Sequence, residues 1–161
     1  MDTTDTMLTK RASETQEFGQ TVAASLTPPV VVCLYGELGS GKTTFVQGFA
    51  KGLGIDTRLL SPTFIIVRRY SLKSRKSFFY HIDLYRTNTV SDLEGLGLRE
   101  IFSDPHAIIC IEWAERLGNL LPKDRIDIQF EVVNDEERKI IVNKAIKSEA
   151  RSTKSETNSN V

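Results

Sequence analysis

The segment Gly36-Glu37-Leu38-Gly39-Ser40-Gly41-Lys42-Thr43 decides the fold of this chain, because it matches the pattern G-x-x-x-x-G-K-[ST] in full. Glycines in this pattern let the backbone fold around an anion and turn N–H groups toward it. The lysine, Lys42, can reach the β- and γ-phosphates of a nucleotide, and the hydroxyl of Thr43 is the expected Mg²⁺ ligand. The segment therefore predicts a phosphate-binding loop, or P-loop.

The pattern also needs a buried strand before the loop and a helix after it. The run Val30–Tyr35 is continuously apolar and rich in β-branched residues, which is typical of a strand buried on both faces. After the loop, Phe45, Phe49 and Leu53 recur at helical spacing, and the start of that helix would add the positive end of its dipole to the phosphate site. Both neighbours that the pattern requires are thus predicted.

The composition is that of an ordinary globular chain of 161 residues, of which 40% are hydrophobic and 26% are charged. Lys+Arg and Asp+Glu are 21 each, and this balance argues against a protein that grips nucleic acid by bulk charge. The absence of a long apolar run and the polar first 15 residues predict no membrane helix, no secretory signal and a cytoplasmic location. Cys33 and Cys110 are expected to be buried core residues, and His81 and His106 lack zinc-ligand spacing.

The rest of the chain predicts further helices and strands around this centre. Ser13 and Gln16 fit a capping box, with Ser13 as N-cap of a helix that runs to about Leu26. The other predicted elements are two strands, Thr63–Tyr70 and Ser77–Asp83, a helical or irregular segment, Val90–Phe102, an all-apolar central strand, Ala107–Glu112, and a strand pair, Arg125–Val133 and Arg138–Ala145.

These elements predict an α/β fold with a single P-loop NTPase-like domain over residues 1–146. We expect a mixed, mostly parallel sheet with helices on its faces and a C-terminal β-hairpin. Residues 147–161 are almost without apolar side chains and are expected to form a disordered polar tail.

Two acidic residues that follow apolar strands are candidates to hold the Mg²⁺ ion of a nucleotide. Asp83 ends one predicted strand and Glu112 ends another. Because strand ends supply the metal-holding carboxylate in such folds, both side chains are expected to emerge at the sheet edge rather than inside the core. Either acid could also orient or deprotonate the attacking water. The sequence does not divide these roles, and each acid could instead be a solvated strand-end charge.

The motifs GELGSGKTTF, SPTF, HIDLYR, DLEGLGLREIF and IEWAERL–LP occur in this order. Together they resemble the TsaE (YjeE) family over roughly Ser13 to Ala145. That family consists of small bacterial P-loop ATPases that take part in threonylcarbamoyladenosine modification of tRNA. The resemblance implies ATP and Mg²⁺ as cofactors. It also implies TsaB and TsaD homologues as partners, which transfer the threonylcarbamoyl group to adenosine 37 of tRNAs reading ANN codons. ATP turnover, slow in the chain alone, would reset or drive that complex, through which contact with tRNA would run.

The resemblance implies roles for single residues. Lys42 and Thr43 would hold phosphate and Mg²⁺. Asp83 would be needed for hydrolysis near the metal, and Glu112 would bind Mg²⁺ through water. Trp113 would lie near the nucleotide, and the base would be bordered by Thr15 and by Glu137-Arg138. The candidates are therefore Lys42, Asp83 and Glu112 as catalytic residues, Thr43, Glu112 and Asp83 as metal ligands, and Thr15, Glu37, Leu38, Gly39, Ser40, Gly41, Lys42, Thr43, Thr44, Trp113, Glu137 and Arg138 as cofactor-binding residues.

Two segments allow both a functional and a structural interpretation. Thr63 could sense the γ-phosphate, or could simply begin a strand after Pro62. The segment Arg68–Lys76 holds five basic residues and no acid, where relatives are usually less basic. It fits a docking surface for tRNA or an acidic partner, but a solvated hairpin is the interpretation favoured by sequence alone.

Other functional classes make different demands. A small GTPase would need N-K-x-D, and Asn143-Lys144-Ala145-Ile146 lacks the acid. A small-metabolite kinase would carry an arginine-bearing lid and would phosphorylate a small acceptor. A nucleotide-binding interaction module would release no phosphate, with or without partner proteins.

Overall fold

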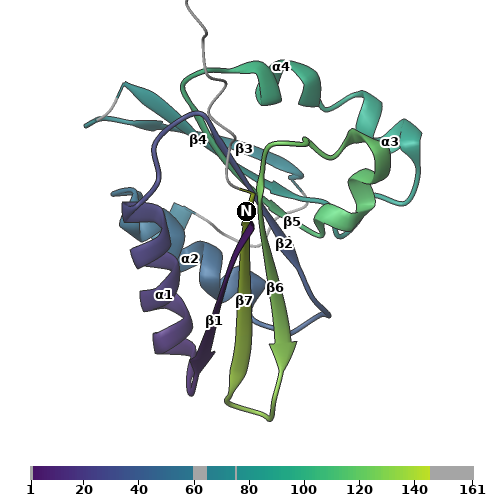
Figure 1. Ribbon diagram of the computed structural model, residues 1–161. Coiled ribbons are helices and arrows are strands. Elements are labelled where there is room, and N and C mark those ends of the chain that lie inside the picture. The colour runs from purple at the N-terminus through teal and green to yellow at the C-terminus, as the bar shows by residue number, and fades with distance from the viewer. Residues whose placement is uncertain (1, 60–64, 75, 146–161) are drawn as a thin grey trace, which may run out of the picture.

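The structure, a computed structural model, describes residues 2–59, 65–74 and 76–145 (Figure 1). Within these residues, seven strands form one sheet in the order β1-β7-β6-β2-β5-β4-β3. The strands are β1 (Asp2–Thr9), β2 (Val30–Tyr35), β3 (Val67–Leu72), β4 (Ser77–Asp83), β5 (Ala107–Glu112), β6 (Ile126–Val132) and β7 (Arg138–Ala145). The helices are α1 (Ala12–Ala24), α2 (Lys42–Gly52), α3 (Val90–Glu94) and α4 (Leu98–Ser103), with 3₁₀ segments η1 (Thr57–Leu59) and η2 (Ala114–Leu120).

The sheet is mixed and mostly parallel, as predicted. Strands β6, β2, β5 and β4 run parallel to one another. The outer strands β1, β7 and β3 pair antiparallel, and β6 and β7 form the predicted C-terminal hairpin. The predicted fold class is therefore confirmed.

Two hydrophobic clusters cover the two faces of the sheet. Val32 and Leu34 of β2 point into one cluster, with Phe45 and Phe49 of α2, whereas Cys33 points into the other, beneath α3, α4 and η2. Because successive side chains of a strand point to opposite faces, β2 is buried on both, as its unbroken apolar run predicts. Figure 1 shows α1 and α2 side by side on one face, with α3 and α4 on the other side of the sheet.

Both cysteines are buried, as expected from the sequence. Cys33 and Cys110 are unbonded to each other and fully covered by the core. Burial raises the pKa of the Cys33 thiol to about 12, and burial also raises the pKa of Cys110. Neither thiol is therefore reactive at neutral pH. No helix in the described ranges is both long and apolar enough to cross a membrane.

The N-terminal region departs from the sequence prediction in two ways. Residues 2–9 form the edge strand β1, which pairs with β7 and was not predicted. Its side chains are mostly exposed, so it lacks the apolar alternation that reveals a half-buried strand. The capping box at Ser13 is also wrong. The helix begins at Ala12, and the Glu14 carboxylate accepts a hydrogen bond from the Lys10 amide at 2.6 Å.

Other boundaries also differ from the prediction, since β3 ends at Leu72 rather than Tyr70, and β6 runs over Ile126–Val132 rather than Arg125–Val133. Helix α1 ends at Ala24 rather than Leu26, and β3 begins at Val67 rather than at Thr63. Thr63 itself and the predicted tail over residues 147–161 lie outside the described residues.

Candidate nucleotide-binding site

Three parallel strands end at the same edge of the sheet, and this edge assembles the site. The P-loop follows β2 directly. Glu112 ends β5 and is the register partner of both Leu34 on β2 and Asp83 on β4. Since the carboxyl ends of parallel strands are where ligands bind in open α/β sheets, the two predicted carboxylates stand at the expected place.

The P-loop requires glycine at two positions for different physical reasons. Gly36 has a φ of 145°, and a Cβ there would lie 2.6 Å from Ser40 Oγ and 2.7 Å from the Phe130 carbonyl oxygen. Gly41 is left-handed, with a φ of 103°, at the N-cap of α2. The loop therefore wraps tightly and turns directly into the helix, with the unpaired N–H groups of the first helical turn facing the site.

Lys42 lies at the base of the loop and is 4% exposed. Its ammonium donates to the carbonyl oxygens of Gly36 at 2.5 Å and Glu37 at 2.8 Å, and lies 4.2 Å from the centroid of the Trp113 ring. Burial lowers the pKa of this ammonium, while nearby carboxylates, led by Glu112, act in the opposite direction. The cation is thus held inside the loop, where a phosphate oxygen could replace carbonyl contacts.

Glu112 is a buried carboxylate with two fixed partners. Its Oε1 accepts a hydrogen bond from the Thr43 hydroxyl at 2.7 Å, and its Oε2 lies 2.7 Å from His81 Nε2. The residue is 2% exposed, so the expectation of a side chain that emerges from the core is wrong for Glu112. Thr43 of the P-loop helix and His81 of β4 thus supply a partner to each oxygen, which is why its burial is tolerated.

Asp83 is less covered and differs from Glu112 in its surroundings. Its Oδ1 accepts a hydrogen bond from the Tyr85 amide at 3.0 Å. Burial and the negative charge of Glu112 raise the pKa of Asp83, against the opposing effects of His81 and Lys42. A raised pKa makes the Asp83 carboxylate a stronger base, and its lower burial and its hydrogen bond from a backbone amide distinguish it from Glu112.

Trp113 adopts a backbone conformation that is rare for a large residue. Its φ is 58°, in the left-handed region, directly after β5. This turn sends the chain sharply away from the sheet and places the indole against Lys42 and against the Tyr85 ring, whose centroid is 5.1 Å away. Such strain is found where the surrounding structure fixes a functional side chain.

A cavity of about 480 Å³ lies over these groups and extends toward α1 and the β6–β7 turn. Of the predicted residues it is lined by Thr15, Leu38, Gly39, Gly41, Lys42, Thr43, Thr44, Asp83, Glu112, Trp113 and Arg138. Glu37, Ser40 and Glu137 do not line it. The Glu37 carbonyl oxygen and the Ser40 hydroxyl contact Lys42 from beneath, and Glu137 instead accepts a hydrogen bond from Asn134.

Arg138 joins two borders of this cavity. Its guanidinium donates to the Asn134 carbonyl oxygen at 2.7 Å and to the Gly39 carbonyl oxygen at 3.1 Å. The β6–β7 turn and the P-loop are thereby linked. Near it, Thr15 is buried and shares a hydrogen bond of 2.8 Å with the Thr9 hydroxyl of β1.

Sequence reasoning missed several residues that belong to the site. His81 is the important one, and its signal was present: in a strand, residues 81 and 83 point to the same face, so the motif HIDLYR places His81 beside Asp83. Among the cavity-lining residues that were missed, Tyr85 belongs to the same motif. The others carry no local pattern and come together only through the fold, namely Arg11, Ala12, Asp135 and Glu136.

A family model described as "Threonylcarbamoyl adenosine biosynthesis protein TsaE" matches residues 9–140. The chain belongs to the TsaE family. The resemblance inferred from the motifs is thus confirmed, and TsaE proteins act in the biosynthesis of threonylcarbamoyladenosine in tRNA.

Individual relatives agree with this assignment. The TsaE protein of Bacillus subtilis is 39% identical over 132 residues, which are 82% of this chain and 80% of that protein. The TsaE protein of Borreliella burgdorferi is 42% identical over 64% of this chain and 74% of that protein. The crystal structure of YdiB from Bacillus subtilis superimposes with a TM-score of 0.73 at 33% identity, covering 89% of this chain and 87% of that one.

Proposed function

We propose that this TsaE family member is a Mg²⁺-dependent ATP-binding protein and slow ATPase that acts on a TsaB–TsaD complex. In this role its ATP turnover would be required for threonylcarbamoyl modification of adenosine 37 in tRNAs reading ANN codons. The observation that carries the proposal is the convergence of Lys42, Thr43, Glu112 and Asp83 on one cavity at the carboxyl edge of the sheet.

Phosphate binding follows from the P-loop itself. The amides at the start of α2 and the ammonium of Lys42 offer donors to the β- and γ-phosphates of ATP. The base would occupy the far part of the cavity, between Thr15 and Arg138. The Gly39 carbonyl contact made by Arg138 keeps the loop and the β6–β7 turn together, so the two halves of the nucleotide would be bound by one connected wall.

The donor set at the sheet edge fits magnesium. The Thr43 hydroxyl oxygen and Glu112 Oε1 lie 2.7 Å apart, close enough to serve one small cation or a water bound to it. Hydroxyl and carboxylate oxygens are the hard ligands that Mg²⁺ prefers. No group of three or more His, Cys, Asp or Glu residues in the described ranges forms a metal site by itself, so phosphate oxygens and water would complete the coordination. When bound, Mg²⁺ would neutralise phosphate charge.

The two carboxylates then have separate roles. Glu112 is held by Thr43 and by His81, which suits a fixed acceptor near the ion. Asp83 has one oxygen held by the Tyr85 amide and a raised pKa, which suits a group that orients water or accepts its proton.

The first test combines calorimetry with phosphate release, in the presence and absence of TsaB and TsaD. Lys42→Ala should weaken Mg²⁺–ATP binding by about 10- to 100-fold, because hydrogen bonds to charged groups contribute about 1.5–3 kcal/mol. Asp83→Ala and Glu112→Ala should keep the fold, and Asp83→Ala should lower turnover by about 100-fold or more. Lys51→Ala, at the exposed other end of α2, is the matched control and should change neither quantity.

Two results would count against this function. One is Mg²⁺–ATP binding by Lys42→Ala that equals the wild type. The other is full turnover in both carboxylate variants with native circular dichroism. Phosphorylation of a small acceptor in place of phosphate release would identify a kinase instead.

A further inference from the structure

The acidic and basic residues of this chain are unevenly distributed, although its net charge is zero. Residues 57–82 contain six of the 21 basic residues and none of the 21 acidic residues. The rest of the chain therefore carries an excess of acid, including the carboxylates around the nucleotide cavity. The acid-poor stretch contains β3 and most of β4, which form one side of the sheet.

Three exposed cations of this stretch lie on the β3–β4 hairpin, and we call them the basic edge: Arg69, Lys73 and Lys76. Arg69 is on β3, and the two lysines are in the turn that joins β3 to β4. None of the ion pairs within the described part of the chain involves these three residues.

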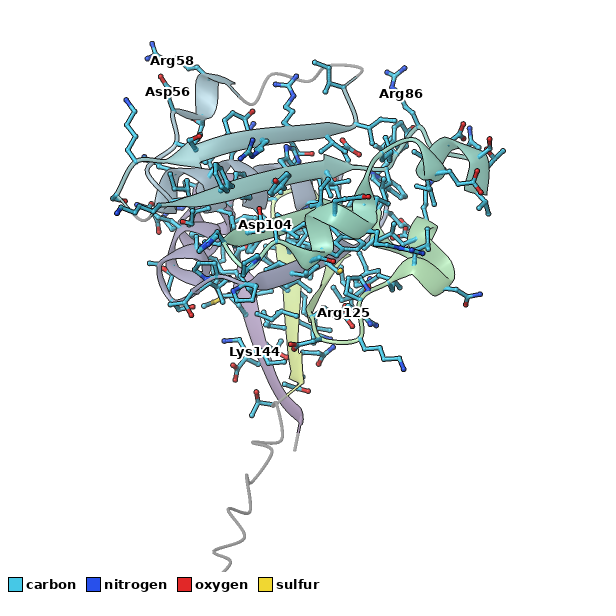
Figure 2. All side chains as sticks on the ribbon, turned by 90° about the horizontal axis from the view of Figure 1, so that it is seen from above. Asp56, Arg58, Arg86, Asp104, Arg125 and Lys144 are labelled. Atoms are coloured by element: carbon cyan, nitrogen blue, oxygen red, sulfur yellow. The ribbon has the colours of Figure 1, made fainter. Side chains whose placement is uncertain are left out.

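The neighbourhood of the basic edge adds little negative charge. Asp104 accepts hydrogen bonds from the Tyr80 hydroxyl at 3.4 Å and the His106 amide at 2.9 Å, and Tyr80 is a neighbour of Arg69, so this carboxylate offsets one of the three cations. Asp56 is paired with Arg58 at 2.5 Å. In Figure 2, Arg58 and Arg86 project at opposite ends of the β3 side of the molecule, and Asp104 lies further in. The field at this edge is thus positive.

Arg69 has a further feature that points to nucleic acid. Its guanidinium carbon lies 3.8 Å from the centroid of the Phe78 ring and 6.0 Å from that of Tyr80. The aromatic rings therefore support a flat cation on an exposed strand. A guanidinium plane can stack on an unpaired base while neighbouring lysines contact phosphates, which is a common mode of RNA recognition. An acidic protein segment would need the charges but not the stack.

We propose that the basic edge binds RNA directly, with tRNA as the ligand. The inference rests on the proposed function for its choice of tRNA, and goes beyond it because contact through the partner complex alone needs no such surface. Arg69 stacks on a base or binds the backbone, and Lys73 and Lys76 neutralise phosphates. The phosphates of tRNA would then face the basic edge, which sets the side from which tRNA approaches.

The test is fluorescence anisotropy of a labelled, unmodified tRNA with the full chain, without nucleotide or partner proteins. The triple variant R69E/K73E/K76E should bind at least about tenfold more weakly than the wild type, and its salt slope should fall by about 2 because up to three phosphate contacts are lost. The control variant K51E/R99E/K123E reverses three exposed cations elsewhere and changes net charge equally. The tRNA affinity of this control should stay closer to that of the wild type than to that of R69E/K73E/K76E.

Three outcomes would overturn the proposal: no tRNA binding by the wild type at about 50 mM salt, equal losses in the two triple variants, or poly-L-glutamate binding at least as tightly as tRNA. The last would assign the edge to an acidic protein instead. Calorimetry with Mg²⁺–ATP on the same proteins separates this result from the ATPase proposal. R69E/K73E/K76E should bind ATP normally, whereas failure of the wild type to bind ATP would remove the proposed function and leave the RNA measurement unaffected.

Discussion

Asp83 couples the chemistry of the site to the stability of the fold. Burial and repulsion by Glu112 raise its pKa above the ordinary carboxyl value of 3.8, so the folded state binds its proton more tightly than the unfolded chain. The contribution of protonated Asp83 to folding stability is fully present below pH 3.8 and is lost as the pH rises through the pKa of the folded state. We predict that Asp83→Asn, without nucleotide, melts at a higher temperature than the wild type at pH 7, and that this difference shrinks toward pH 4.

The control for Asp83 is a carboxylate with the opposite shift. Hydrogen bonds from Arg58 lower the pKa of Asp56, so Asp56→Asn should lose a little stability near neutral pH and none at low pH. If the two substitutions changed the melting temperature in the same direction at pH 7, the assigned cause of the Asp83 shift would be wrong.

His81 is a positioning residue that acts through Glu112. Its Nε2 lies 2.7 Å from Glu112 Oε2, and its ring is parallel to the Phe79 ring within 3°. Removing it leaves a buried carboxylate oxygen without this partner, so His81→Ala should weaken the apparent Mg²⁺ affinity in phosphate release by about 10- to 100-fold. His81→Gln, which keeps an N–H at a similar reach, should restore much of that affinity. If both variants lost turnover equally and their Mg²⁺ dependence stayed that of the wild type, His81 would have only a packing role.

At the scale of elements, α1 and α2 pack so closely that a Cβ at Gly19, Gly48 or Gly52 would clash with the backbone of the other helix. A Cβ on Gly48 would lie 1.9 Å from the Gln16 carbonyl oxygen, and one on Gly19 would lie 2.3 Å from that of Phe45. Because these clashes are with backbone, neither helix can relieve them by a side-chain rotation. We predict that Gly48→Ala destabilises the protein by about 1–3 kcal/mol in urea unfolding. Gly95→Ala, which has open space around its Cβ, should cost far less.

The same scale shows what the sequence could and could not predict. The boundaries of β2, β4 and β5 were predicted to the residue, because mainly apolar runs end at a glycine or an acid. Strand β1 was missed because an exposed edge strand needs no apolar face. The P-loop and both carboxylates were found because a local pattern encodes them. The burial of Glu112 was not predicted, since it depends on His81 and Thr43 from two other elements.

At the scale of the molecule, the cavity joins segments that are far apart along the chain. Its walls come from the start of α1, the P-loop, the ends of β4 and β5, and the β6–β7 turn. A ligand that touches all of them binds only the folded state, so its binding free energy adds to the stability of the whole domain. This makes the thermal transition a reporter of site occupancy that does not depend on turnover.

We therefore predict that Mg²⁺–ATP at about 100 times its dissociation constant adds about 2.7 kcal/mol of stability. For a domain of this size that corresponds to a rise in melting temperature of about 5–10 °C. Lys42→Ala should lose most of this rise at the same ATP concentration. The substitution also removes the buried contacts of Lys42, so the shifts that ATP causes in each protein are compared, not the melting temperatures themselves. A shift of equal size in Lys42→Ala would mean that ATP binds elsewhere, since the Lys42 ammonium is the cation held by the Gly36 and Glu37 carbonyl oxygens and the Ser40 hydroxyl at the base of the P-loop.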